Sequence, residues 1–373
     1  MRPSASPGLS LSPQAETRSS WRPARRNNLT AHVPRTSDPG RSRSRPSARG
    51  HRAEAPQGVS MSWLPTADAD TDPRRPDGVE MVILPRASDI GGLEVRRALP
   101  FRSRRMVGPF IFWDQMGPGE FLRGRGIDVR PHPHVGLTTV TYLLSGSIDH
   151  RDSLGNDLRI HAGDVNLMTA GAGIVHSERT GQDVRQRPSS LFGVQSWLAQ
   201  PRSHEDRAPE FTRAPRQDLP TFDEPGISGR LILGEFMGVR SPVATQWPSL
   251  YVDVCMERGA KLGIPATTEE RAIYTLVGRI EVGGVRFPPQ QMLVLRPGDD
   301  VTVVAQDDVR LMILGGAVMD GPRYIDWNFV SSSKERLARA REDWRNGRFP
   351  IIPSDADEFT PLPDDSPTSR TPS

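Results

Sequence analysis

Two pairs of side chains that can bind a metal are the most informative feature of this sequence. His132 and His134 are separated by one residue, and so are His176 and Glu178 further along the chain. Side chains in a β-strand alternate between two faces, so residues i and i+2 point the same way. If the two strands lie side by side, three imidazoles and one carboxylate converge. We therefore predict a metal site formed by His132, His134, His176 and Glu178.

The predicted ligands restrict the metal. Imidazole nitrogens and a carboxylate oxygen suit divalent Fe, Ni, Cu, Mn, Zn or Co better than an ion that prefers thiolates. A lone histidine in a strand is usually a core or surface residue. His150, His161 and His204 have no paired partner at the required spacing. We expect these three to be structural or exposed, with His150 a candidate only for a supporting place beside the ligands.

The segments around the ligand pairs are typical of strands. Residues 135–144 are rich in β-branched and aromatic side chains, and the Ser-Gly-Ser sequence at 145–147 closes them with a turn. Similar short segments, separated by Gly and Asx turns, are found at 79–84, 93–100, 107–113, 191–198, 229–233, 249–254, 272–277, 278–282, 292–295, 301–304 and 309–314. This pattern predicts an all-β sandwich or barrel.

The β pattern occurs twice. Residues 276–281 echo residues 143–149, and residues 296–299 echo residues 161–164. The echo indicates an internal duplication of one small barrel. The second copy contains no histidine, so we expect it to lack a metal site of the first type and to have a structural role.

These patterns divide the chain into four parts. We expect a disordered basic arm and linker at 1–78, a first barrel with the metal site at 79–215, and a second barrel without metal ligands at 216–330. Residues 331–373 should form a helix and a tail rich in Pro and Asp. The sequence Ser-Ser-Lys-Glu at 332–335 resembles a capping box, and the helix is expected to end at Gly347.

The positive charge is concentrated in the arm. Residues 1–60 contain eleven Arg against three acidic residues, a net charge of +8 that leaves −5 for the remainder, because the whole chain carries +3. We favour a start codon assigned too early, with Met61 as the true first residue. A transit peptide and a nucleic-acid-binding tail are the alternatives. The acidic remainder argues against direct binding of nucleic acid by the folded body.

The single cysteine, Cys255, excludes an intramolecular disulfide and fits a reducing compartment. It falls in an apolar segment, where we expect a buried strand residue and not a nucleophile. No apolar run is long enough to span a bilayer. We therefore expect a cytoplasmic protein that does not associate with a membrane.

Several motifs together resemble the pirin family of the cupin superfamily. They are His-Pro-His-Val-Gly-Leu at 132–137, Thr-Val-Thr-Tyr-Leu at 139–143, His-Arg-Asp-Ser-Leu-Gly at 150–155, Met-Thr-Ala-Gly at 168–171 and Gly-Ile-Val-His-Ser-Glu at 173–178. The resemblance implies a bicupin fold of two consecutive jelly-roll barrels followed by a helix. It also implies one mononuclear site, with Fe(II) as the usual metal, on His132, His134, His176 and Glu178.

One departure from the general cupin pattern favours pirins. That pattern places an acidic residue a few positions after the second histidine, but residues 136–142 contain none. The acid instead stands beside His176, as it does in pirins.

The resemblance also implies a function. Bacterial members resemble quercetin 2,3-dioxygenases, so we expect a flavonol-like substrate and O2, with Glu178 acting as a ligand or as the base that takes the flavonol proton. The alternatives are a non-enzymatic, iron-binding, redox-responsive regulator that acts through a protein partner, and an inactive relic with a structural metal. A deep apolar pocket lined by Phe112, Trp113, Met168 or Phe192 would favour small-molecule chemistry.

Overall fold

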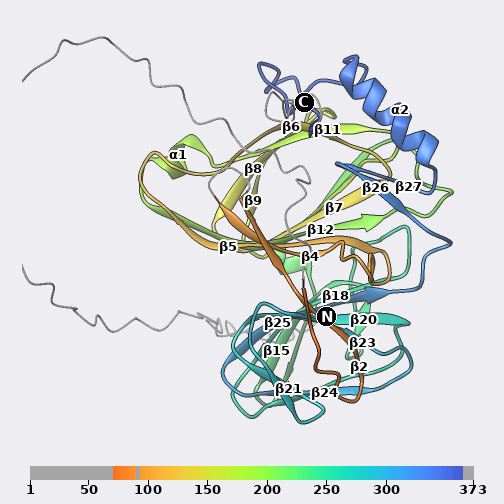
Figure 1. The fold of residues 1–373 in the computed structure, drawn as a ribbon. Helices are drawn as coiled ribbons and strands as arrows, with labels where there is room; N and C mark the ends of the chain where they lie inside the picture. Colours follow the sequence, from red (N-terminus) through yellow and green to blue (C-terminus); the bar gives the residue numbers. More distant parts are fainter. Residues whose placement is uncertain (1–69, 90–92, 364–373) are drawn as a thin grey trace, which may run out of the picture. The chain divides into compact units, whose positions relative to one another are not determined.

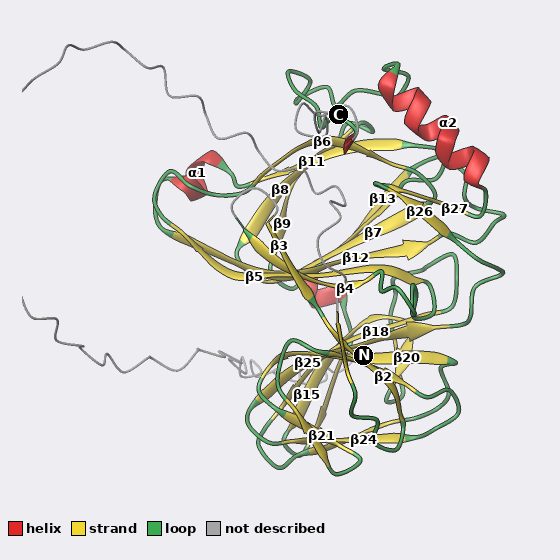
Figure 2. Ribbon diagram, viewed as in Figure 1, coloured by secondary structure: helices red, strands yellow, loops and turns green. Residues whose placement is uncertain are grey.

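The computed structural model describes residues 70–89 and 93–363 (Figure 1). Strands dominate this part of the chain and form two barrels, and a helix follows near the C-terminus (Figure 2). The expected all-β fold with two consecutive barrels is confirmed. The predicted arm up to residue 69, including Met61, and the last part of the tail, 364–373, lie outside the described residues. Within the described ranges, no helix has the length and apolar character needed to cross a bilayer.

The first barrel consists of a seven-stranded and a four-stranded antiparallel sheet. The larger sheet has the order β13 (Glu210–Ala214), β10 (Val165–Thr169), β7 (Leu137–Ser145), β12 (Ser189–Ala199), β5 (Phe110–Phe121), β4 (Glu94–Leu99) and β3 (Arg86–Asp89). The smaller sheet has the order β6 (Asp128–His134), β11 (Ile174–Arg179), β8 (Ser147–Asp152) and β9 (Asp157–His161). A short helix, α1 (Gln182–Arg185), connects β11 to β12.

The second barrel has the same construction. Its larger sheet has the order β1 (Asp70–Asp72), β2 (Val79–Leu84), β23 (Met292–Leu295), β20 (Glu270–Val277), β25 (Val309–Gly316), β18 (Ser249–Met256), β15 (Ile227–Leu233) and β14 (Thr221–Glu224). Its smaller sheet has the order β19 (Lys261–Ile264), β24 (Val301–Ala305), β21 (Ile280–Val282) and β22 (Val285–Phe287). The turn η1 (Arg216–Asp218) precedes β14, and a small hairpin of β16 (Glu235–Phe236) and β17 (Val239–Arg240) lies between β15 and β18.

The two barrels are related strand by strand. The order β10, β7, β12, β5 matches β23, β20, β25, β18, and β6, β11, β8, β9 matches β19, β24, β21, β22. Gly146 after β7 and Gly278 after β20 have φ values of 82° and 77°. A Cβ at these glycines would lie only 2.3 Å from the Ser190 carbonyl oxygen and 2.4 Å from the Asp308 carbonyl oxygen, respectively. The repeated glycines in the sequence therefore mark equivalent turns.

In the second barrel, the strands equivalent to those that carry the candidate ligands are apolar. Strands β19 and β24 correspond to β6 and β11, and they pair Leu262 with Val303 and Ile264 with Val301. All four side chains are buried in one hydrophobic cluster. The second barrel therefore packs hydrocarbon where the first barrel places imidazoles.

Strand β2 corrects the expected domain boundary. We expected residues 79–215 to form the first barrel, but Val82 and Ile83 in β2 pair with β23 of the second barrel. Residues 70–72 were expected to belong to a linker, yet they form β1, which pairs with β2. Val79 and Val82 are buried in the core of the second barrel, and Ile83 is buried in the cluster between the barrels. This long-range pairing leaves no mark on the local sequence.

The C-terminal segment returns to the first barrel. It comprises β26 (Tyr324–Asp326), β27 (Phe329–Ser331), α2 (Lys334–Arg345) and the tail to residue 363 (Figure 1). The Val330 amide donates to the Val135 carbonyl at 3.0 Å, and the Thr360 amide donates to the Pro131 carbonyl at 2.8 Å. This segment therefore packs along the strand that carries the first two histidines, from Pro131 within it to Val135 just after it.

Helix α2 begins one residue later than the capping box predicts. Its N-cap is Ser333, whose hydroxyl accepts a hydrogen bond from the Arg336 amide. In a capping box, Glu335 would accept a hydrogen bond from the Ser332 amide. Glu335 instead accepts from the Ser333 hydroxyl at 2.8 Å, and the Ser332 amide donates to Glu205. The helix ends at Arg345, with Gly347 in a left-handed conformation shortly after it.

The large sheets of the two barrels pack against each other through aromatic side chains. The ring of Trp113 lies 5.6 Å from that of Tyr251 and 5.3 Å from that of Tyr274, measured between centroids. The Tyr142 hydroxyl donates to Asp253 at 2.8 Å, and Arg310 also donates to this carboxylate. One buried cluster therefore joins both barrels.

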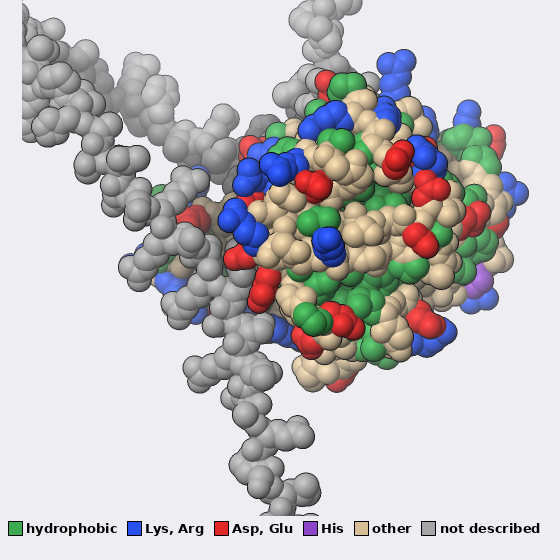
Figure 3. Space-filling model, turned by 90° about the horizontal axis from the view of Figure 1, so that it is seen from below, with side chains coloured by type: hydrophobic (Ala, Val, Ile, Leu, Met, Phe, Trp, Pro, Cys, Tyr) green, Lys and Arg blue, Asp and Glu red, His purple; other side chains and the backbone are tan. Residues whose placement is uncertain are grey.

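Charged side chains on the surface are mixed in sign. On the face shown in Figure 3, acidic and basic residues are interspersed, with a group of Lys and Arg side chains at one edge. A protein that binds nucleic acid mainly through its phosphates needs a continuous basic surface. This face does not offer one.

Truncation of the central aromatic residue should destabilise both barrels together. We expect Trp113→Ala to lower the free energy of unfolding by about 3–5 kcal/mol, because it leaves a cavity in the shared cluster. Urea unfolding followed by fluorescence and circular dichroism measures this loss. Leu122→Ala is the control, since Leu122 is 77% exposed, and it should change stability by about 0.5 kcal/mol or less. A small effect of Trp113→Ala would contradict the importance of this cluster.

Candidate metal centre

The predicted ligand strands are neighbours. Strand β11 lies between β6 and β8, and His176 is directly opposite His132. A register shift follows between His176 and Glu178, so that Glu178 lies opposite Val129. The two sequence pairs therefore meet in the same sheet, as the alternation argument requires.

The four predicted residues form two overlapping groups. Donor atoms of His132, His134 and His176 lie within 4.8 Å of one another, and the Nε2 atoms of His134 and His176 are 3.0 Å apart. Glu178 belongs to a second group of the same size with His176 and His150. All five side chains are buried. The structure thus brings the three histidines together and places Glu178 on the far side of His176. Their role as ligands stays a prediction.

Two of the imidazoles are held in a defined orientation. His132 Nδ1 donates to the Arg130 carbonyl at 2.9 Å, and His134 Nδ1 donates to the Asn328 carbonyl at 3.0 Å. A carbonyl can only accept, so these bonds place the proton on Nδ1 and leave Nε2 with its lone pair. The Asn328 contact comes from the C-terminal segment, so that segment helps to orient a candidate ligand.

Burial keeps the histidines neutral. It lowers the pKa of His132 to about 4 and lowers the pKa of His134 and His176 well below the ordinary value. Burial raises the pKa of Glu178, although the hydrogen bond from Gln195 opposes this shift. Neutral imidazoles are the form that binds metals. His176 Nδ1 is also buried without a partner among the described residues. This donor set fits a divalent cation.

Two polar residues lie next to the candidate ligands: Gln195, which the sequence analysis missed, and His150, for which it expected at most a supporting place. Gln195 Nε2 donates to Glu178 Oε1 at 2.8 Å. His150 lies opposite Glu178, and its Nε2 is 3.1 Å from the Asp152 carboxylate. The statement that His150 has no partner at the right spacing is therefore wrong: Asp152 is its partner at i+2. The other two histidines of the described residues, His161 and His204, lie outside both groups.

Gln195 belongs to a row of buried polar residues across the large sheet. Cross-strand pairing aligns Asn166, Thr141, Gln195, Asp114 and Arg97 on five neighbouring strands. Arg97 donates to both oxygens of Asp114 at 2.8 and 2.7 Å. Directly paired residues share a face, so the row faces the barrel interior together with Gln195. The large sheet therefore lines the candidate metal centre with buried polar side chains.

Aromatic side chains pack next to this row of polar residues. The rings of Phe112 and Trp197 are stacked with centroids 4.0 Å apart, and Trp197 lies 5.2 Å from His134. Met168 is also buried, near Ile174 of β11. By contrast, Trp113 and Phe192 belong to the cluster between the barrels. The expectation that they line the site is wrong, because they point to the opposite face of the sheet.

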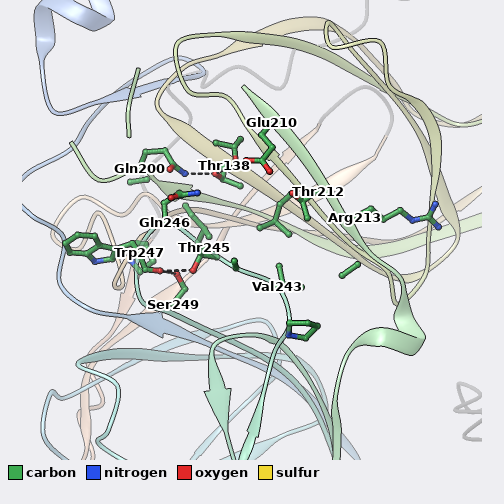
Figure 4. A pocket seen from close by; sticks show the side chains of 18 of the residues that line it. Thr138, Gln200, Glu210, Thr212, Arg213, Val243, Thr245, Gln246, Trp247 and Ser249 are labelled. Atoms are coloured by element: carbon green, nitrogen blue, oxygen red, sulfur yellow. Dashed lines mark hydrogen bonds between the residues drawn. The ribbon is translucent and has the colours of Figure 1, made fainter. Parts of the chain in front are cut away.

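A separate cavity of about 440 Å³ lies between the barrels (Figure 4). Its lining includes Thr138, Gln200, Thr212 and Thr245, and Gln200 donates to the Thr138 hydroxyl. None of the four predicted ligands lines it. It is therefore distinct from the metal centre.

Acid should destabilise the metal-free protein through these histidines. The unfolded chain binds a proton at His132 near pH 6.5, whereas the folded chain does so only near pH 4. The free energy of unfolding should therefore fall as the pH drops through this window, by about 3 kcal/mol for His132. The raised pKa of Glu178 has the opposite effect on stability. The folded state favours the protonated carboxyl group, so the stability that Glu178 contributes is lost as the pH rises.

Urea unfolding of metal-free protein between pH 7 and pH 4 measures this effect. His132→Gln should show a shallower loss of stability than the unmodified protein. His161→Gln is the control, since His161 is exposed, and it should leave the slope unchanged. Equal slopes for the unmodified protein and His132→Gln would contradict the buried, neutral state of His132.

Comparison with known proteins assigns the chain to a family. A family model for pirin matches residues 92–198, and one for the pirin C-terminal cupin domain matches residues 251–350. A pirin-like protein of Caulobacter vibrioides is 44% identical over 77% of this chain and its own full length.

Solved structures agree with this assignment. The crystal structure of a quercetin 2,3-dioxygenase from Acinetobacter baumannii has a TM-score of 0.71 and 34% identity, covering 78% of this chain and 97% of that one. A bacterial pirin from Escherichia coli, crystallised with nickel(II), shares the fold at a TM-score of 0.50 and 17% identity, covering 64% of this chain and all of that one. The chain therefore belongs to the pirin family, with two cupin barrels.

Proposed function

We propose that this protein is a metal-dependent dioxygenase that uses O2 to open a ring of a flavonol-like substrate, as in quercetin 2,3-dioxygenase chemistry. The observation that carries the proposal is the group of three buried, neutral imidazoles inside the first barrel, with Glu178 in a second group that shares His176. Its similarity to the quercetin 2,3-dioxygenase of A. baumannii supports the reaction type.

His132, His134, His176 and Glu178 would hold the metal. A bound divalent iron would supply Lewis acidity and one-electron chemistry toward O2. We favour Fe(II), while Ni, Cu, Mn, Zn and Co suit the same ligands. The nickel(II) complex of the E. coli relative illustrates this breadth for a protein of the same fold.

Glu178 is the candidate base. Burial raises its pKa, which makes the carboxylate a better proton acceptor for an acidic substrate hydroxyl. Gln195 donates to Oε1, so it fixes the carboxylate orientation and leaves Oε2 to accept the proton. The stacked rings of Phe112 and Trp197 are buried beside His134, where they exclude water from this side of the candidate centre.

Removal of a histidine from the group of His132, His134 and His176 should abolish both metal binding and O2 consumption. We expect His134→Ala to lower metal content after Fe(II) loading and to reduce quercetin-dependent O2 uptake to background. Glu178→Gln should reduce uptake by about 100-fold or more through loss of the base. Metal analysis and an oxygen electrode, after anaerobic Fe(II) loading, give both readouts.

His161→Ala is the matched control, because His161 is an exposed histidine of the same barrel, and it should retain metal and uptake. Metal-loaded unmodified protein that consumes no O2 with quercetin would remove the dioxygenase proposal.

A second candidate is a redox-responsive regulator that acts through a protein partner. The observation in its favour is a connection from the ligand strand to the surface. Ser177, between His176 and Glu178, donates to Asp355 at 2.7 Å, and Arg179 donates to both oxygens of the same carboxylate. The tail that carries Asp355 also exposes Ile351 and Phe359.

Hydrogen exchange of Fe(II)- and Fe(III)-loaded protein tests this candidate. A regulator of this kind should change amide protection in residues 350–363 when the metal is oxidised. Arg179→Lys should weaken the change, because Lys cannot make the two-pronged contact with Asp355. Identical protection in both oxidation states would contradict regulation through this segment.

A further inference from the structure

We propose that His150 is a further nitrogen donor of the metal centre, so that His150, His176 and Glu178 form a second set of donors next to His132, His134 and His176. This inference rests on the proposed metal centre and extends it. It explains why the donor atoms separate into two groups that share His176.

The sheet places His150 at this position through its register. Strand β8 pairs with β11 so that His150 is opposite Glu178 and Asp152 is opposite His176. His150 and Asp152 are both buried, as expected for residues i and i+2 on the inner face. Three adjacent strands, β6, β11 and β8, therefore each present one such pair to the barrel interior.

The spacing of the donors suits a cation. The donor atoms of His150, His176 and Glu178 lie within 4.8 Å of one another. Because metal–nitrogen and metal–oxygen distances are about 2.0–2.2 Å, donors on one ion lie about 3–4 Å apart. Small side-chain movements would therefore bring either His150 or Glu178 onto an ion that is held by His176.

His150 is also oriented in the way that metal-binding histidines usually are. Its Nε2 donates to Asp152 at 3.1 Å, which leaves the lone pair on Nδ1. Asp152 is itself fixed by the Asn156 side chain at 2.8 Å and by the Leu154 and Asn156 amides. Phe211 packs over the His150 ring with centroids 4.8 Å apart.

The second set of donors would allow Glu178 to leave the metal and act as a base. Gln195 holds the Glu178 carboxylate at 2.8 Å on the side of the large sheet. When Glu178 is held there as a base, His150 can replace it as a donor, and the metal keeps four protein ligands. His150 and Glu178 are therefore exchangeable partners in metal binding.

A double-mutant cycle with Ni(II) alone tests this exchange. Ni(II) affinity is measured by competition with a chelator for the unmodified protein, Glu178→Gln, His150→Gln and the double variant. Each single change should weaken binding by about tenfold or less, because the other donor compensates, and the double variant should lose more than the product of the two. Single effects that simply multiply would overturn the proposal.

The number of bound imidazoles gives a second readout. Pulsed electron paramagnetic resonance of Cu(II)-loaded Glu178→Gln should count four imidazoles, and the double variant should count three. Three in both would overturn the proposal, whereas no metal binding by the unmodified protein would overturn the metal centre itself.

A second variant keeps the test decisive if His150→Gln does not fold. Asp152→Asn retains His150 and removes only the carboxylate that orients it. It should weaken Ni(II) binding by about 10-fold or more in the Glu178→Gln background, and by less in the unmodified background. Equal losses in both backgrounds would contradict a donor role for His150.

Discussion

Burial of several metal-binding groups inside one barrel is the constraint on which the rest of the first barrel depends. Imidazoles and a carboxylate removed from water cost free energy unless each finds a partner. The surrounding structure supplies those partners: backbone carbonyls for His132 and His134, Gln195 for Glu178, and Asp152 for His150. His176, the residue shared by both groups, has its Nδ1 atom buried without a hydrogen-bond partner among the described residues.

The second barrel shows what the same topology does without this constraint. At the positions of the ligand strands it carries Leu262, Ile264, Val301 and Val303, which form a plain hydrophobic core. Apolar packing of this kind stabilises a barrel without any need for a partner at each atom. Equivalent strands of the two barrels therefore carry candidate metal ligands in the first copy and a hydrophobic core in the second.

Much of this arrangement could be predicted from the sequence, because it depends on local patterns. Alternation predicted that each ligand pair shares a face, and turn glycines such as Gly146 predicted the strand boundaries. Contacts between distant segments could not be predicted in this way. Nothing in the local sequence of β12 indicates that Gln195 contacts Glu178 of β11. Likewise, Asn328 lies 194 residues after His134, so their contact has no local signal. His150 could have been found, since its partner Asp152 has the same spacing as the other pairs.

Each end of the described chain completes the barrel that is more distant from it in sequence. Strand β2 precedes the first barrel in sequence but completes the sheet of the second, and the segment after the second barrel returns to cover the first. A cut between residues 215 and 216 would therefore not release two self-sufficient halves. The N-terminal piece would carry an unpaired apolar strand and would lose the carbonyl that orients His134, while the C-terminal piece would have an open sheet edge. Each barrel is therefore completed by a chain segment that lies beyond the other barrel in sequence.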